Sequence, residues 1–358
     1  MVSDVGRRGF FGSGFDSIEV MSKLPKIGLD IGSAAIKLVE LAPISGGRWR
    51  LVSAGTAPKP AGNWIDSPST QVAVVNIITK LAKEAGVRSK RVATALPEEL
   101  ISTHVLEMPV LSEAEVGQAL LWQVEQYIPI PVDQAVWSYQ IISRSSAGVE
   151  VLLAAASRSL VDAYHQVVEQ AGFETVAIET ELMATARSIV PAGAATEVVV
   201  DVGAKSTDVG IVSRGQMVFA RTIPTAGEAF TRAVESVLGI DSSQAEQYKS
   251  AYGFAESYLG GKLNTAMKPV LAVIATEVKK TIDFYVSKHP GESVKLVVLS
   301  GGAAALPEIV KMLSEMLGLE VSIGDPFSQV DLDEKQKKIL LPGGAFYSVA
   351  VGLAMRPD

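Results

Sequence analysis

The sequence predicts an α/β protein of two lobes, in which mixed sheets are flanked by helices. The chain has 358 residues, 48% hydrophobic and 20% charged, which is more than one ordinary core accommodates. Short apolar runs alternate with longer runs of helical periodicity. Three expected strands joined by short turns open the first half, and the same order returns from Glu197 onward. This repetition predicts two similar halves.

The expected elements of the first half follow from apolar runs and from helix start and stop signals. The strands are Lys26–Ile31, Ala35–Leu41, Trp49–Thr56, Arg91–Leu96, Ser102–Met108, Ala135–Ser143, Val149–Ala156 and Thr175–Ile178. The helices are Ser69–Gly86, a segment from the capping box of Ser112 and Glu115 to about Tyr127, and Ser159–Gly172. We expect residues 1–22, which contain Gly and Ser, to form a flexible tail.

The second half repeats this arrangement. Its expected strands are Glu197–Gly203, Thr207–Ser213, Met217–Ile223 and Val294–Ser300. Its expected helices are Gly227–Gly239, Ser242–Gly253, Thr265–Lys288 and Leu306–Leu317, followed by a buried helix with a Gly-rich start within Ile339–Met355.

Composition excludes several classes of function. The net charge is −7, and no stripe of Lys and Arg is present, so direct nucleic-acid binding is not expected. Cysteine is absent, which excludes disulfides and thiolate metal sites. His104, His165 and His289 lie far apart without ligand spacing. No run reaches the roughly 20 apolar residues of a membrane span, and no signal peptide is expected.

A pair of matching motifs points to a ligand. "GLDIGSAAIKLVEL" and "VVDVGAKSTDVGIV" each contain an apolar strand, Asp-x-Gly, a small polar turn and another apolar strand. The aspartates are Asp30 and Asp201, and the glycines are Gly32 and Gly203. Glycine lets backbone N–H groups approach an anion, and the hairpins can face each other across a cleft. Hydroxyl donors in these turns are Ser33, Ser206 and Thr207.

The aspartates indicate a metal ion. One carboxylate about 6 Å from a phosphate charge costs roughly 3 kcal/mol at an effective dielectric of about 20. Two carboxylates beside a triphosphate therefore require a cation, and Mg²⁺ is held by one or two carboxylates with phosphate oxygens. Lys37 and Lys205 are candidate partners of the phosphates. The alternative is a pair of ordinary hairpins with Asp-Gly turns, but the paired occurrence favours nucleotide binding.

Two further segments support a nucleotide site. In "LVVLSGGAAALPEIV" a strand is followed by Gly301–Gly302 and by a helix expected to open at Leu306–Pro307, so a base or phosphate can approach the backbone. In "AEQYK", Glu246 and Lys249 lie on one helix face, positioned to reach a ribose and base. Taken alone, without the other motifs, this pair is better explained as an ordinary solvated ion pair.

These motifs, in this order from Lys26 to about Met355, resemble the phosphate-1, phosphate-2 and adenosine motifs of the actin-like ATPase superfamily. "LDIGSAAIKLVEL" in particular resembles the PilM family of type IV pilus assembly proteins, relatives of the cell-division protein FtsA. The resemblance implies an actin-like (ribonuclease H-like) two-lobed fold with duplicated mixed sheets and an FtsA-type small extra domain. It also implies ATP and Mg²⁺ as ligands, with metal ligands Asp30 and Asp201 and with Gly227 among the nucleotide contacts.

The resemblance implies a layout and a role. The expected parts are a tail (1–22), a first lobe (23–95 and 157–190) interrupted by the small domain (96–156), a second lobe (191–340) and a returning C-terminal helix (341–358). The role is a cytoplasmic platform of pilus assembly with weak ATPase activity at most, peripheral at the inner membrane. It is recruited there by the cytoplasmic N-terminal peptide of a PilN-type protein. Other pilus assembly proteins and self-association are further expected contacts.

Some alternatives stay open at this stage. In "AIETELMATAR", expected in the connecting helix, both Glu179 and Glu181 are candidate catalytic acids. Other functions on the same fold are an FtsA-like cell-division role and a small-molecule kinase. A kinase needs a general base beside a substrate pocket, and no Asp or Glu has that signature. FtsA would end in an amphipathic membrane helix, and "VAVGLAMRPD" favours PilM instead.

Overall fold

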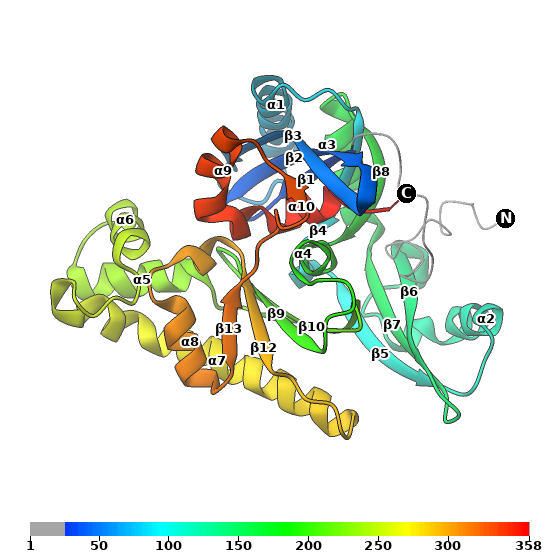
Figure 1. Ribbon diagram of the computed structural model, residues 1–358. Coiled ribbons are helices and arrows are strands. Elements are labelled where there is room, and N and C mark those ends of the chain that lie inside the picture. The colour runs from blue at the N-terminus through cyan, green and yellow to red at the C-terminus, as the bar shows by residue number, and fades with distance from the viewer. Residues whose placement is uncertain (1–25, 358) are drawn as a thin grey trace. The chain divides into compact units, whose positions relative to one another are not determined.

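The computed structural model describes residues 26–357 (Figure 1). The predicted tail, residues 1–22, lies outside the described residues. The chain forms two compact units. Within the described residues, the first unit comprises 26–184, 216–219 and 349–357, and the second comprises 185–215 and 220–348. Across residues 26–357, none of the helices combines the length and the apolar character that crossing a membrane requires.

The main sheet of the first unit contains the strands in the order β3-β2-β1-β4-β8. Strand β1 is antiparallel to β2 and parallel to β4, which is parallel to β8. All six residues of β1 are buried, as expected of a central strand covered on both faces. The bounds are β1 (Lys26–Ile31), β2 (Ala35–Ile44), β3 (Arg48–Pro58), β4 (Arg91–Leu96) and β8 (Glu174–Thr180).

Helices cover this sheet. α1 (Pro68–Ala85) packs on β3, and α3 (Arg158–Gln170) packs on β4 and β8. α10 (Ser348–Ala354) approaches β1 at Gly28, where an added Cβ would lie 1.8 Å from the Ala350 carbonyl oxygen. Gly28 therefore lets the C-terminal helix pack directly on the central strand.

A small antiparallel sheet follows β4 in the chain, with the order β5-β7-β6. Its strands are β5 (Ser102–Met108), β6 (Ala135–Arg144) and β7 (Val149–Ser157). The predicted capping box is confirmed at the start of α2 (Glu113–Gln123). The Ser112 hydroxyl accepts the Glu115 N–H, and the Glu115 carboxylate accepts the Ser112 N–H. Buried side chains of α2 and the sheet form one apolar core.

The second unit repeats the topology of the first, with the order β11-β10-β9-β12-β13. Strand β9 is antiparallel to β10 and parallel to β12, as β1 is to β2 and β4. The strands of this sheet are β9 (Glu197–Val202), β10 (Thr207–Ser213), β11 (Gln216–Ile223), β12 (Leu296–Ser300) and β13 (Glu320–Ile323). The second unit also contains the short strand β14 (Val330–Asp331), which is not part of this sheet. Its helices are α5 (Gly227–Leu238), α6 (Ser242–Tyr252), α7 (Lys262–Lys288), α8 (Ile309–Leu317) and α9 (Glu334–Leu340).

The structure corrects two sequence expectations. The helix expected to open at Leu306–Pro307 begins at Ile309 instead, because a 3₁₀ turn occupies Gly302–Ala305 and Glu308 adopts φ +62°. The connecting helix α4 (Glu181–Ile189) begins later than expected, and Glu179 belongs to strand β8. Strands β13 and β14 and helix α9 were not predicted.

Candidate functional site

The two Asp-x-Gly hairpins are closed by the same backbone hydrogen bond. The Gly32 N–H donates to the Ala35 carbonyl at 3.1 Å, and the Gly203 N–H donates to the Ser206 carbonyl at 3.0 Å. In each hairpin the aspartate lies at the carboxyl end of the central strand. The sequence similarity therefore corresponds to a real structural repeat.

The first hairpin holds its aspartate in an ion pair. The Lys37 Nζ lies 2.7 Å from Asp30 Oδ2, and these side chains are only 13% and 3% exposed. The two residues are directly opposite on β1 and β2. Lys37, predicted as a phosphate partner, thus neutralises Asp30 in this structure. Ser33, at the tip of the turn, is exposed.

The second hairpin is fixed to the start of α5. The N–H groups of Gly227 and Glu228 donate to the carbonyls of Gly203 and Ala204 at 3.0 and 2.8 Å. The buried Thr207 hydroxyl donates to the Thr225 carbonyl at 2.7 Å, so this predicted phosphate donor is engaged in holding the segment before α5. Lys205 is exposed and Ser206 is half-buried at the tip of the turn.

The Gly301–Gly302 turn packs on the same hairpin. Gly301 has φ 84° and ψ 177°, a conformation that essentially only glycine adopts. An added Cβ would lie 2.5 Å from the Val202 carbonyl oxygen and 2.6 Å from Asp201 Oδ1. Asp201 Oδ2 also accepts a hydrogen bond from the Thr185 hydroxyl at 3.2 Å. The second unit therefore brings the predicted metal ligand and the glycine turn into contact.

Glu246 and Lys249 extend this cluster through α5 and α6. The buried Lys249 Nζ donates to the Gly227 carbonyl, the Thr231 hydroxyl and Glu246 Oε2 at 3.2, 2.9 and 2.6 Å. Burial acts to raise the pKa of Glu246, but hydrogen bonds from Lys249 and Thr231 outweigh it and lower that pKa. Glu246 remains 54% exposed, so Lys249 orients a carboxylate that a ligand can reach.

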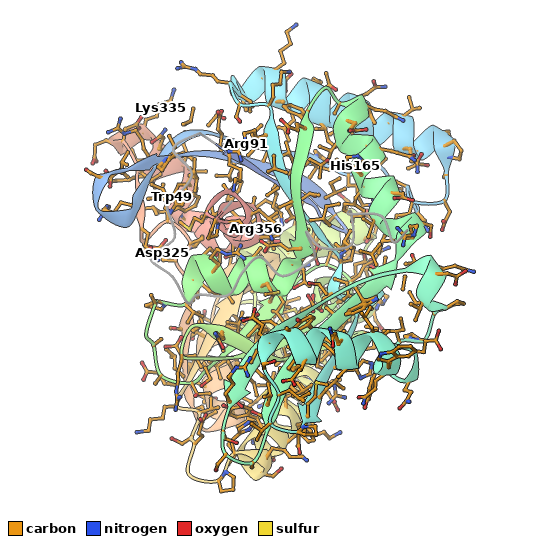
Figure 2. All side chains as sticks on the ribbon, turned by 90° about the vertical axis from the view of Figure 1, so that its right-hand side faces the viewer. Trp49, Arg91, His165, Asp325, Lys335 and Arg356 are labelled. Carbon is orange, nitrogen blue, oxygen red and sulfur yellow. The ribbon has the colours of Figure 1, made fainter. Side chains whose placement is uncertain are left out.

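The two candidate acids have different surroundings. Glu179 is 1% exposed, and its Oε2 lies 3.6 Å from Nε of Arg356, in the C-terminal segment (Figure 2). Glu181 is the first residue of α4 and is half-buried. Glu179 is thus part of a buried ion pair, whereas Glu181 stands at a helix start next to the carboxyl ends of the parallel strands.

A carboxyl group that the sequence analysis missed lies beside Glu181. Burial raises the pKa of Glu98 to about 7, against the opposing effect of hydrogen bonds from Leu182 and Thr180. The signal for it was present, since "LPEEL" places Glu98 and Glu99 directly after the predicted strand Arg91–Leu96. Perturbed carboxyl groups at such strand ends are typical of functional sites.

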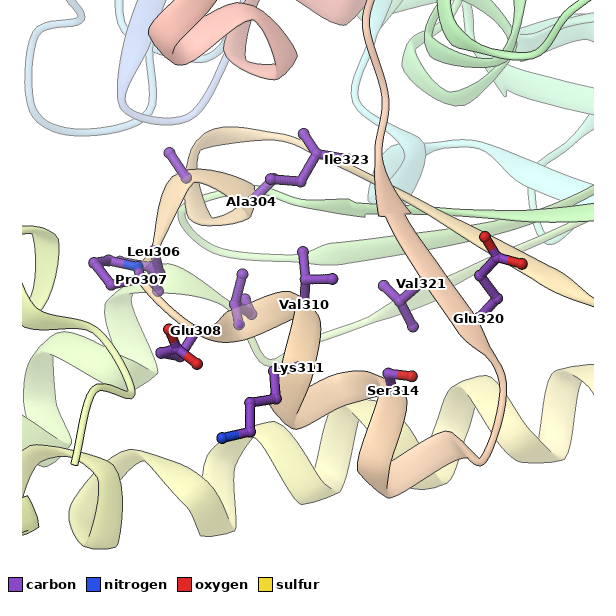
Figure 3. Close-up of a pocket in the computed structure, with 12 residues that line it drawn as sticks. Ala304, Leu306, Pro307, Glu308, Val310, Lys311, Ser314, Glu320, Val321 and Ile323 are labelled. Carbon is purple, nitrogen blue, oxygen red and sulfur yellow. The ribbon is translucent and has the colours of Figure 1, made fainter.

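A pocket of about 610 Å³ lies on the second unit, along α8 and β13 (Figure 3). Its walls are mostly apolar and include Leu306, Val310 and Val321. Neither Asp201 nor Glu246 lines it, so this pocket is separate from the polar cluster. Among residues 26–357, no three His, Cys, Asp or Glu side chains gather as a preformed metal site.

The apolar segment after Ser112 divides into core and surface. Leu120, Val124 and Ile128 are buried in the core of the small sheet, and Tyr127 and Ile130 pack against it. Leu121 and Trp122 remain 63% and 86% exposed on α2. Leu121 and Trp122 are therefore a surplus apolar pair, since the core of the small sheet does not use them.

The duplicated sheets and paired hairpins define an α/β protein of the actin-like ATPase fold, as predicted. The chain belongs to the family described as type IV pilus assembly protein PilM, because the model of that family matches residues 28–358.

The chain is also similar to known proteins outside and within this family. The cell division protein FtsA of Streptococcus pneumoniae serotype 2 (strain D39 / NCTC 7466) is 25% identical over 346 residues, covering 84% of this chain and 75% of FtsA. The structure described as a PilM-PilN type IV pilus biogenesis complex has a TM-score of 0.80 and 25% identity, covering 93% of this chain and 98% of that chain. MreB 5 of Spiroplasma citri, bound to AMPPNP, shares the fold, with a TM-score of 0.51 and 13% identity over 92% of this chain and 94% of that chain.

Proposed function

We propose that this chain binds ATP with Mg²⁺ as an actin-like component of type IV pilus assembly. The observation that carries the proposal is the packing of Gly301 on Asp201 and Val202, which places a bare backbone turn beside a carboxylate and the Gly203 loop. At the next residue, Gly302, an added Cβ would have only Phe346 within contact distance, so a base or a phosphate has room to approach the backbone there. Glu246 then accepts a ribose hydroxyl, and Gly302, which is exposed, contacts the base.

The residues present fit a nucleotide-bound Mg²⁺. This ion commonly takes one or two protein carboxylates and completes its shell with water and phosphate oxygens, so a cluster of three protein ligands is not required. Asp201 and Asp30 are the proposed carboxylates, acting from the two equivalent hairpins. Mg²⁺ supplies charge neutralisation of the phosphates. Lys37 is proposed to turn from Asp30 to phosphate when a cation relieves the ion pair.

Glu181 is the proposed catalytic carboxylate for slow hydrolysis. Glu179 is excluded from this role in our proposal because its carboxylate is buried against Arg356 and would have to give up that ion pair. Glu181 lies at the first turn of α4, where a carboxylate is favoured by the helix dipole. Its role is to orient and deprotonate the attacking water.

The partner proposal starts from the surplus apolar pair. We propose that residues 96–156 form the FtsA-type small domain and that Leu121 and Trp122 help to dock the cytoplasmic N-terminal peptide of a PilN-type inner-membrane protein. The similarity to a PilM-PilN complex supports this partner. A few buried apolar anchors suffice to hold such a peptide. The partner would then place the chain at the cytoplasmic face of the inner membrane.

The nucleotide proposal is tested by calorimetric titration of ATP into the chain with Mg²⁺ and with EDTA. We expect Asp201→Asn to weaken Mg²⁺-dependent binding by about tenfold or more, because charged contacts contribute roughly 1.5–3 kcal/mol. Asp208→Asn is the matched control, since Asp208 is directly opposite Asp201 but accepts the Thr222 hydroxyl at 2.6 Å. Equal affinity of the wild type and Asp201→Asn would refute the assignment.

The partner proposal is tested by fluorescence anisotropy of the labelled PilN-type peptide. Leu121→Asp and Trp122→Ser should each weaken binding by about tenfold, as expected for an interface anchor. Val72→Asp is the control, because Val72 is 56% exposed on α1. If all variants bind equally, the docking surface lies elsewhere.

A further inference from the structure

Glu98 holds the chain on both sides of Glu181. Its Oε2 accepts the Leu182 N–H at 3.4 Å, and the Thr180 hydroxyl is hydrogen-bonded to its carboxylate. The Met183 N–H in turn donates to Thr180 Oγ1 at 3.2 Å. The first turn of α4 is therefore capped by Thr180 and by Glu98, a residue that follows β4 and is distant in sequence.

Simple helix capping does not require this arrangement. Thr180 already supplies the local cap that Ser, Thr, Asp or Asn usually provides. Glu98 is only 5% exposed, and within residues 26–357 it has no ion-pair partner, whereas the buried Glu179 is paired with Arg356. Burying a carboxyl group that is bonded only to neutral donors opposes stability. The position of Glu98 is thus better explained by an effect on Glu181, which lies between Thr180 and Leu182.

Glu181 stands among other carboxyl groups. Since β1, β4 and β8 are parallel, their carboxyl ends meet at one edge of the sheet, with Asp30 on β1 and Glu181 after β8. The surroundings of Tyr164 on α3 also indicate that these carboxyl groups are close together. Burial, and then the charges of Glu181, Asp30 and Glu99, raise the pKa of Tyr164 well above its usual value. Glu181 therefore lies in the same corner as Asp30, the proposed metal ligand.

We infer that Glu98 is a positioning residue that fixes Glu181 at the start of α4 by binding Leu182 and Thr180. The inference rests on the proposed function, in which Glu181 orients the attacking water. Without the Glu98 acceptor, the buried Leu182 N–H loses its partner and the first turn of α4 loosens. Glu181 then loses its defined position, while the Gly203 and Gly301 backbone of the second unit is unchanged.

The test compares Glu98→Ala and Glu98→Gln with Glu99→Ala, the exposed neighbour, as matched control. The first readout is amide hydrogen exchange at Leu182 and Met183 in the full chain without nucleotide. We expect Glu98→Ala to accelerate it by about tenfold, because a hydrogen bond to a buried acceptor is lost. Glu98→Gln retains an oxygen acceptor and should stay close to the wild type.

The second readout separates ATP affinity from single-turnover hydrolysis. Glu98→Ala should slow hydrolysis by about tenfold and leave the Kd of ATP within about twofold, and Glu98→Gln should restore the rate. If Glu98→Ala does not fold, Glu98→Asp replaces it, since the shorter side chain withdraws the acceptor. Unchanged exchange and hydrolysis, or an equal loss of ATP affinity, would overturn the inference.

Failure of the proposed function has a different signature. Glu181→Ala with wild-type hydrolysis would overturn the role of Glu181, and the positioning role of Glu98 with it. Unchanged exchange at Leu182 and Met183 in Glu98→Ala would overturn only the role of Glu98.

Discussion

Substitution of Gly301 tests whether the glycine turn is dictated by its contact with the second hairpin. Gly301→Ala would place a Cβ 2.5 Å from the Val202 carbonyl oxygen, while real Cβ atoms essentially never come closer than 3.0 Å. The backbone conformation alone costs about 1–3 kcal/mol for a residue with a side chain, and overpacking adds about 1–3 kcal/mol. We therefore expect a loss of about 2–6 kcal/mol, or roughly 4–24 °C in the Tm of the second unit.

Gly302→Ala provides the matched control. Its Cβ would have only Phe346 within contact distance, at 3.8 Å, and Gly302 does not have positive φ. Scanning calorimetry of the two variants should show a lowered transition for Gly301→Ala and an almost unchanged one for Gly302→Ala. Equal transition temperatures would show that the turn does not pack on Asp201 and Val202 as described.

The pH dependence of stability tests the burial of Glu98. Its pKa is raised from 4.5 to about 7, so its contribution to stability is fully present below pH 4.5 and is lost as the pH rises through 7. Denaturant unfolding should show Glu98→Gln gaining up to roughly 3 kcal/mol over the wild type between pH 4.5 and 8, and a constant difference would contradict this. In the small sheet, Leu120→Ala should cost about 2–5 kcal/mol and Leu121→Ala less than about 0.5 kcal/mol, because only Leu120 is buried. Similar losses in both variants would refute that division.

Local patterns predicted most of the fold because local physics decides it. The strands Arg91–Leu96, Ser102–Met108 and Thr207–Ser213 have the predicted bounds, since each is a short apolar or alternating run between turns. The capping box at Ser112 was predicted for the same reason. The start of α8 was not predicted. The chain just before it is held by a hydrogen bond from the Phe254 N–H to the Pro307 carbonyl, which joins segments that are distant in sequence.

The residues of the candidate site were easier to name than to assign to a contact. Lys37 forms an ion pair with Asp30, and the buried Lys249 contacts Gly227 and Glu246. These contacts were not predicted, because sequence spacing alone does not identify the partner of a lysine. Likewise, Glu179 could not be distinguished from Glu181 without Arg356, which lies in the C-terminal segment.

A crystal structure of the full chain with AMPPNP and Mn²⁺ tests the central claim most directly. Mn²⁺ replaces Mg²⁺ at oxygen ligands and is located by its anomalous scattering. We predict an anomalous peak beside the Asp201 carboxylate, with the base against Gly302 and the ribose at Glu246. Nucleotide bound in the pocket along α8 and β13, or a Mn²⁺ peak away from both Asp201 and Asp30, would contradict the account.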